Sequence, residues 1–177
     1  MTNYIVSVKL SGLLGQRPVT MENHIVLCGL GTVGYRVAEG LVARGEHIAV
    51  LESSEANRFL PLIRTHREQV QLVIADARLR DSLSLMNVMA ARCIITATND
   101  DMANIQAALN ARQLNPGIRV VFRMFDQSAA QRVAETFGFQ VALSASALAA
   151  PTFVAAACGQ AVVQDFPSAP GGWRWRR

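Results

Sequence analysis

The sequence predicts a doubly wound α/β fold with a mostly parallel six-stranded sheet. Short apolar runs alternate with segments of helical periodicity along most of the chain. The runs are almost continuously apolar, as in strands of a parallel sheet that are buried on both faces. A glycine-rich segment also follows the first run and opens the first helix, which is typical of the Rossmann-like members of this class.

Each expected element follows from this alternation. The first run ends at a glycine, and the helix after it stops at Gly45. The second expected helix contains Pro61. The expected strands are 24–28, 47–52, 71–76, 92–98, 119–124 and 140–144, and the expected helices are 32–44, 55–65, 79–89, 101–114, 127–137 and 147–163.

The chain has 177 residues, which suits one domain with short appendages. We expect residues 1–22 to be a linker or the remnant of a preceding element, 23–164 to form the domain, and 165–177 to be an irregular tail. The tail has tryptophans among arginines, so a membrane-surface contact is the alternative to a disordered end. Residues 141–163 carry no charge, but their alanines, serines and Pro151 argue against a membrane span.

Composition excludes several classes of function. Three of the four net positive charges come from Arg174, Arg176 and Arg177, so the fold itself carries no basic surface for nucleic acid. Lys9 is the only lysine, which excludes Schiff-base chemistry and a P-loop lysine within the domain. The three cysteines form no metal-binding pair and lie in apolar runs, so we expect buried, reduced thiols and no metal site.

The glycine-rich segment predicts a dinucleotide-type site. It comprises Gly29, Leu30, Gly31, Thr32, Val33 and Gly34. The first glycine permits a tight turn, the second allows the backbone to approach a pyrophosphate, and the third lets helix and strand pack closely. The amide groups at the start of the helix then favour a phosphate. A simple tight turn is the alternative.

Glu52 ends the second expected strand, eighteen residues after Gly34. A carboxylate at this place can accept hydrogen bonds from both ribose hydroxyls and would repel a 2′-phosphate, so NADP is disfavoured. The alternative is a solvated carboxylate at the end of a strand.

Further polar residues follow the later strands, at the edge where ligands bind in this topology. Asp76 follows the third strand, and Thr98, Asn99 and Asp100 follow the fourth. A helix N-cap is an equally good interpretation of these residues. Arg123, near the end of the fifth strand, is able to pair with a phosphate or, alternatively, with Asp126.

Groups for catalysis are missing from this edge. His24, His47 and His66 fall at the opposite edge of the expected sheet, and no tyrosine–lysine pair at helical spacing is present. The sequence therefore predicts a domain that binds a nucleotide and is not an enzyme.

Several separated segments resemble the nucleotide-binding domain of the regulator-of-potassium-conductance family, also called RCK, KTN or Trk-type N-terminal domains. They are HIVLCGLGTVGYRVAEGL, AVLE, IADAR, TATNDDMANIQAALNARQLNP, IRVVFRMFD and ALSASALAAPTF, and together they cover roughly residues 23–164. Their order and spacing agree with the family, which is far more specific than one glycine loop.

The resemblance implies a cytoplasmic regulatory domain that binds NAD or NADH, or else ATP or ADP, and lies at the inner face of the cell membrane. It further implies control of a potassium channel or transporter, and pairing with copies of the same chain through a crossover helix at the C-terminal end. By position, Gly29 to Gly34 would hold phosphates, Glu52 the ribose, and Asp76 with Ala77 the adenosine side. Thr98, Asn99 and Asp100 would line the cleft, and Arg123 would face a phosphate.

Two departures from the family pattern stand out. Ala75 replaces the usual glycine before Asp76, which makes that turn less free to bend. The second ligand-sensing domain that is common in the family does not follow, so the chain is interpreted as a natural short form, a frameshifted product or a fragment. The alternative function is an NAD-dependent oxidoreductase fragment without its catalytic domain, and a nucleotide-responsive module unrelated to ion transport is a third interpretation.

Overall fold

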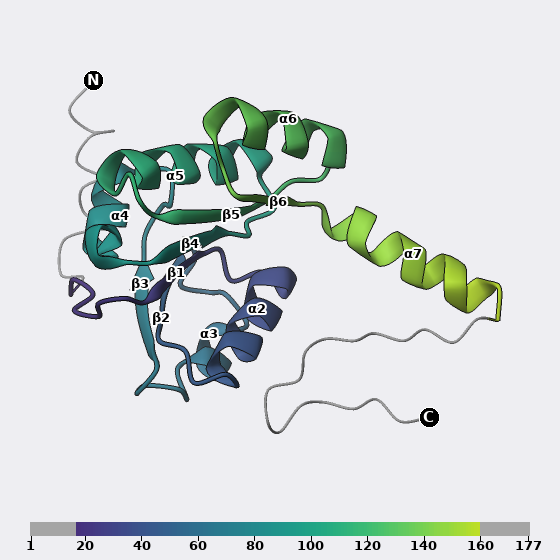
Figure 1. Ribbon diagram of the computed structural model, residues 1–177. Helices are drawn as coiled ribbons and strands as arrows, with labels where there is room; N and C mark the ends of the chain where they lie inside the picture. The colour runs from purple at the N-terminus through teal and green to yellow at the C-terminus, as the bar shows by residue number, and fades with distance from the viewer. Residues whose placement is uncertain (1–16, 160–177) are drawn as a thin grey trace, which may run out of the picture.

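The computed structural model describes residues 17–159, which form one six-stranded parallel sheet with the strand order β3-β2-β1-β4-β5-β6 (Figure 1). The strands are β1 (Ile25–Cys28), β2 (Ile48–Glu52), β3 (Val70–Ile74), β4 (Cys93–Thr96), β5 (Arg119–Arg123) and β6 (Val141–Leu143). The helices are α2 (Thr32–Val42), α3 (Leu60–Ile63), α4 (Arg80–Leu85), α5 (Asp101–Leu114), α6 (Gln127–Phe137) and α7 (Ala145–Ala157), with a 3₁₀ turn, η1, at Val88–Ala90. The predicted fold class is confirmed.

Helices cover both faces of the sheet, as its alternating apolar side chains require. Figure 1 shows α2 and α3 on one face and α4, α5 and α6 on the other. Leu27 and Val50 are fully buried on the α2–α3 side, whereas Val26 and Phe122 are fully buried on the α5 side. The strand order reverses between β1 and β4, and a crevice at the carboxyl ends of the strands is the usual ligand site of such sheets.

The expected helix over residues 55–65 is largely wrong, because only the four residues of α3 are helical. Pro61 lies at the start of α3, where a missing N–H costs nothing. Before it, Asn57 Oδ1 accepts the Phe59 N–H at 2.9 Å, which forms a turn instead of a helix. The segment after β2 is therefore a loop that leads into one helical turn.

The expected helix over residues 79–89 is also interrupted. It ends at Leu85, and Asn87 adopts a left-handed conformation with φ of 51° before η1 begins. The Asn87 side chain donates to the Met21 carbonyl at 2.9 Å, so a contact with the N-terminal segment accompanies the break.

Part of the expected linker packs against the domain. Val19 is 5% exposed, and its N–H donates to the Leu85 carbonyl at 2.8 Å. The Thr20 N–H donates to the Gln71 side chain at 3.1 Å. Residues 17–22 therefore cover one side of the core, and the remaining part of the expected linker lies outside the described residues.

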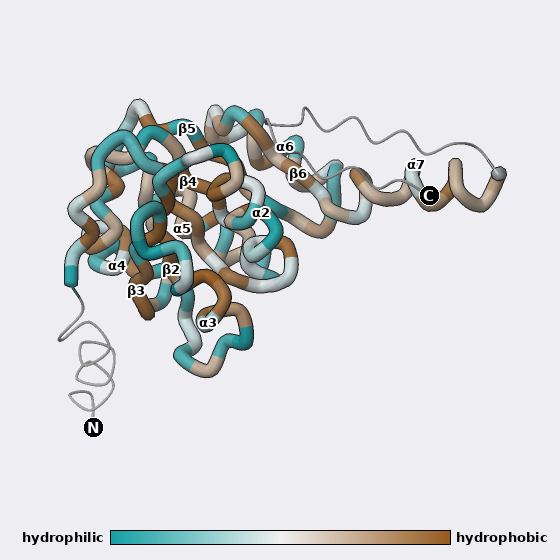
Figure 2. The backbone as a smooth tube through the Cα atoms, turned by 90° about the horizontal axis from the view of Figure 1, so that it is seen from below, coloured by the Kyte–Doolittle hydropathy of each residue, from teal (hydrophilic) through white to brown (hydrophobic). Residues whose placement is uncertain are grey.

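Helix α7 reaches away from the layered body (Figures 1 and 2). None of its thirteen residues is buried, and Leu148, Phe153 and Val154 are exposed. Residues 160–163 of the expected helix and the expected tail lie outside the described residues. Within residues 17–159, no helix is long and apolar enough to span a membrane.

The cysteines divide into two groups. Cys28 and Cys93 are buried free thiols, and burial raises the pKa of Cys28 to about 12. Cys158, which follows α7, is exposed, so the expectation of a buried thiol is wrong there. The cause is the position of α7, which no other described element covers.

Candidate functional site

Two glycines of the segment after β1 are required by the protein's own packing. Gly29 has φ of +92°, and a Cβ atom there would lie 2.9 Å from Thr98 Cγ2. A Cβ atom on Gly34 would lie 2.0 Å from the carbonyl oxygen of Gly29, because α2 starts directly against the turn. The expected roles of the first and third glycine are thus seen in the packing.

Gly31 is different, because nothing in the described chain requires a glycine there. Its φ of −70° and ψ of −171° are open to other residues, and a Cβ atom would meet no atom within 4 Å. Gly31 is the N-cap of α2, which has no side-chain cap, and no acidic side chain stands in its first turn. The amides of Thr32 and Val33 thus begin a helix that has no side-chain cap and no acidic side chain in its own first turn.

Glu52 binds the glycine segment directly. It is 7% exposed, and its Oε2 accepts the Leu30 N–H at 2.7 Å. Its Oε1 accepts the N–H of Ser54 at 3.0 Å and the hydroxyl of Ser53 at 3.3 Å. The alternative of a solvated carboxylate is therefore wrong: Glu52 is an ordered acceptor at the edge of the glycine turn.

Asp76 and Ala77 form the turn after β3. Asp76 accepts the backbone N–H of Arg78 at 2.9 Å and pairs with its guanidinium at 2.7 Å. The hydrogen bonds and the charge of Asp76, with a smaller contribution from the charge of Asp100, raise the pKa of Arg78. Asp76 does not cap α4, whose N-cap is Leu79, and Ala77 packs into the core at 9% exposure.

The loop after β4 is held by a residue that the sequence analysis missed. Asn104, on α5, is fully buried. Its Oδ1 accepts the N–H of Thr98 at 3.0 Å and the Thr98 hydroxyl at 2.8 Å, and its Nδ2 donates to the carbonyls of Thr98 and Arg123, both at 3.1 Å. The available signal was a polar side chain on the alanine-lined buried face of the expected helix.

Asn99 and Asp100 complete this loop and are exposed. The Asp100 side chain accepts the N–H groups of Met102 and Ala103 at 2.9 and 3.1 Å, so the N-cap interpretation is confirmed for Asp100. The structure shows no such cap role for Asn99.

Arg123 does not pair with Asp126, which instead caps α6 through the Ala129 N–H at 2.6 Å. The alternative ion pair is therefore wrong. Arg123 Nη1 donates to the Thr98 carbonyl at 2.9 Å, and its guanidinium lies 4.8 Å from the centre of the Phe125 ring. The structure thus brings Arg123, Thr98 and Gly29 into one cluster at the carboxyl ends of β1, β4 and β5, with Glu52 beside the glycine turn.

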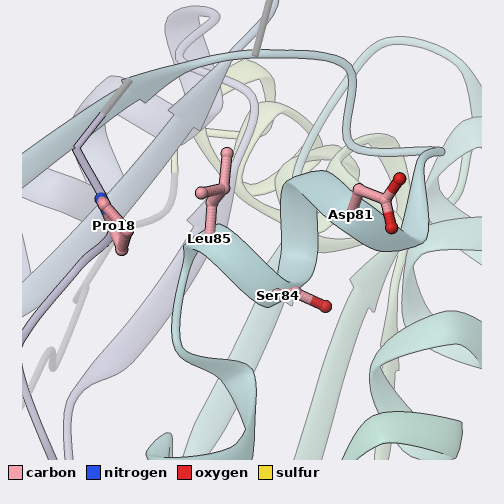
Figure 3. Close-up of a pocket in the computed structure, with 4 residues that line it drawn as sticks. All are labelled: Pro18, Asp81, Ser84 and Leu85. Atoms are coloured by element: carbon pink, nitrogen blue, oxygen red, sulfur yellow. The ribbon is translucent and has the colours of Figure 1, made fainter. Parts of the chain in front are cut away.

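The histidines lie elsewhere. His24 precedes β1, at the amino end of the strand, and is fully buried with Nε2 3.0 Å from the Met86 carbonyl. Burial is the main cause that lowers its pKa. A shallow hollow of about 310 Å³ lies between Pro18 and the α4 residues Asp81, Ser84 and Leu85 (Figure 3). It contains none of the predicted site residues.

Residues 25–145 match the family described as the TrkA-N domain. The chain is similar to the Trk system potassium uptake protein TrkA homolog of Pyrococcus horikoshii, with 32% identity over 58% of this chain and 44% of that protein. It is also similar to potassium channel protein 1 of Methanocaldococcus jannaschii, with 26% identity over 57% of this chain and 30% of that protein. The matched part thus spans less than half the length of either relative.

Solved structures show the same fold. The TrkA-N domain of inner membrane protein ybaL from Escherichia coli superposes with a TM-score of 0.66 at 23% identity, covering 77% of this chain and 97% of that domain. The GsuK channel bound to NAD gives a TM-score of 0.57 at 20% identity, covering 80% of this chain and 26% of the channel. The Shewanella denitrificans Kef C-terminal domain in its AMP-bound form gives a TM-score of 0.66 at 19% identity, covering 77% of this chain and 80% of that domain.

The family match covers the whole sheet and every residue of the cluster described above, and it confirms the resemblance identified from the sequence. The chain belongs to the TrkA-N domain family.

Proposed function

We propose that this chain is a regulatory domain that binds NAD or NADH, or else ATP or ADP, and thereby controls a potassium channel or transporter. The observation that carries the proposal is Gly31. Its backbone and its packing leave room for a side chain, so the space in front of it is open for a group from outside the chain. That space adjoins the uncapped start of α2, where amide groups and the helix dipole favour a phosphate.

The neighbouring residues suit the other parts of a nucleotide. Glu52 is the acceptor for ribose hydroxyls, and its charge disfavours a 2′-phosphate. Asp76 and Ala77 form the turn assigned to the adenosine side. Thr98, Asn99 and Asp100 line the other end of the cleft, and Arg123 is the cation that faces a phosphate. Solved relatives with bound NAD and AMP support this choice of ligand.

The proposed response to the ligand is a change in how two copies of the chain associate. Helix α7 exposes Leu148, Phe153 and Val154 to solvent, and a second copy that receives this helix would bury them. A nucleotide shifts the assembly only if it binds one arrangement more tightly than the other. We place the assembly in the cytoplasm, at the inner face of the membrane, on a potassium channel or transporter subunit, as the names of the relatives suggest.

Calorimetry with NAD, NADH, NADP, ATP and ADP tests the proposal. We expect at least one ligand without a 2′-phosphate to bind, and Gly31→Ala to abolish that binding without loss of folding, because the added methyl group stands where a phosphate would lie. Gly40→Ala is the matched control, since it adds the same methyl group to α2 with only the Arg44 side chain nearby, at 3.5 Å.

Three results would overturn the proposal or part of it. If no nucleotide binds the folded chain, the binding function fails. If Gly31→Ala binds as well as Gly40→Ala, the ligand lies elsewhere. Steady oxidation of NADH with a panel of small carbonyl compounds would show an enzyme and favour the oxidoreductase interpretation.

A further inference from the structure

The two peptide groups that flank Leu30 are each fixed from the protein side, the Gly29–Leu30 group by Glu52 and the Leu30–Gly31 group by Asn57. The Leu30 N–H donates to Glu52 Oε2 at 2.7 Å, and the Leu30 carbonyl accepts from Asn57 Nδ2 at 3.1 Å. Asn57 comes from the loop after β2, where neither the family resemblance nor the sequence analysis assigned it a role. Leu30 itself is fully buried, and both of its backbone groups have ordered partners.

The Asn57 side chain is itself held in place. Its Oδ1 accepts the Phe59 N–H at 2.9 Å, which leaves Nδ2 as the group that faces Leu30. The Phe59 ring stacks on Tyr35 of α2, with centroids 4.5 Å apart and planes 10° apart, and the Arg58 guanidinium lies 4.7 Å from the centre of the Phe59 ring. The loop is thereby anchored to the helix that the glycine segment opens.

The direction of the Gly31 N–H follows from this contact. No peptide bond among residues 17–159 is cis, and in a trans peptide the carbonyl and the following N–H point to opposite sides. Because Asn57 binds the Leu30 carbonyl, the Gly31 N–H points away from the loop. Within the described part of the chain the Gly31 N–H has no acceptor, and the space beside its Cα is open.

We infer that Asn57 is a positioning residue for the phosphate of the nucleotide: it holds the Leu30 carbonyl so that the Gly31 N–H faces the ligand. This inference rests on the proposed function. Without Asn57 the Leu30–Gly31 peptide group loses the hydrogen bond that sets its orientation, and an N–H that points elsewhere donates no hydrogen bond to a phosphate oxygen. Preorganised backbone donors of this kind cost no reorganisation when the ligand arrives.

Asn57→Ser tests the inference. The shorter serine hydroxyl still accepts the Phe59 N–H but does not reach Leu30. Asn115→Ser is the matched control, because Asn115 also accepts the N–H two residues ahead, from Gly117 at 3.1 Å, and donates to distant carbonyls, among them Ala91 at 3.0 Å. The ligands are ADP and adenosine, measured by calorimetry, together with the amide NMR signal of Gly31.

We expect Asn57→Ser to weaken ADP binding by about tenfold while adenosine binding changes by less than about twofold. The shift of the Gly31 amide signal on ADP binding should be lost in Asn57→Ser and kept in Asn115→Ser. Equal losses for ADP and adenosine, or unchanged ADP binding, would overturn the role of Asn57 and leave the proposed function standing. Failure of the wild-type chain to bind ADP and every other nucleotide would overturn both.

Discussion

The Ser144 hydroxyl donates a hydrogen bond to the carbonyl oxygen of Phe125 at 2.7 Å. Ser144 is 1% exposed and is also the N-cap of α7, where its oxygen accepts the Ala147 N–H at 3.3 Å. Asp101, at the start of α5, accepts the N–H of the same Phe125 at 3.0 Å. Phe125 therefore links the start of α5, beside the candidate site, to the N-cap of α7.

Ser144→Ala should lower the free energy of unfolding by about 1 kcal/mol, because it removes an N-cap and leaves the Phe125 carbonyl without this donor. Urea denaturation measures the change. Ser84→Ala is the control, since the Ser84 hydroxyl only donates back along its own helix to the Arg80 carbonyl. Equal stability of the two variants would contradict the role given to Ser144.

Asn104→Ala should be more damaging. Asn104 is fully buried, its oxygen accepts from Thr98, and its amide group donates to the carbonyls of Thr98 and Arg123. Its loss therefore leaves several backbone groups without a hydrogen-bond partner. We expect a loss of ~2–3 kcal/mol in the same denaturation assay. Asn110→Ala, which removes one exposed contact with the Arg78 carbonyl, should cost far less, and a similar cost would count against the network.

Stability should fall as the pH is lowered through the ordinary pKa of His24. Burial, and then the neighbouring Arg92 charge, lower the folded-state pKa of this residue from 6.5, while the Met86 carbonyl acts in the opposite direction. Between the two pKa values the unfolded chain binds a proton that the folded chain does not, so acid favours unfolding.

The free energy of unfolding at about pH 7.5 and about pH 5.5 checks this sign. His24→Gln keeps a donor for the Met86 carbonyl and should reduce the difference between the two pH values. His66→Gln, at an exposed position, should not. A pH dependence that is unchanged in His24→Gln would show that other groups cause it.

Phe153→Glu should convert the proposed dimer to a monomer without affecting the stability of the domain. The Phe153 side chain is 75% exposed within one chain, so a charge there disturbs only what a second copy would cover. Light scattering measures the mass, and Met89→Glu adds the same charge at a comparably exposed site on η1. A dimer that survives Phe153→Glu, or a wild-type chain that is a monomer, would contradict the role of α7.

The sequence predicted the strands and their parallel sheet well, because buried apolar runs and an early glycine turn are local signals. It predicted the helices after β2 and β3 poorly. Asn57 and Asn87 end or prevent those helices by bonding to a nearby N–H or to a distant carbonyl, and Pro61 favours only a short turn. Apolar periodicity alone does not record these competing hydrogen bonds.

The candidate site divides in the same way. The turn at Gly29, the close packing at Gly34 and the N-cap at Asp100 are local features, and the sequence pattern indicated each of them. Asn57 and Asn104 were missed because their partners come from other parts of the chain: Leu30 lies 27 residues from Asn57, and Arg123 lies 19 residues from Asn104. An isolated asparagine carries no sign of such partners until the fold brings them together.

Helix α7 works geometrically as a lever with its fulcrum at Ser144. Thirteen residues at the usual rise make an arm of about 20 Å, and a tilt of about 5° at the fulcrum moves the far end by roughly 2 Å. None of its residues is buried against the sheet, and the side-chain contacts that hold its start are those of the N-cap Ser144 and of Ser146 with the Phe125 carbonyl. A small displacement of Phe125 that tilts the helix by this amount would therefore be enlarged at its far end, without any rearrangement of the sheet.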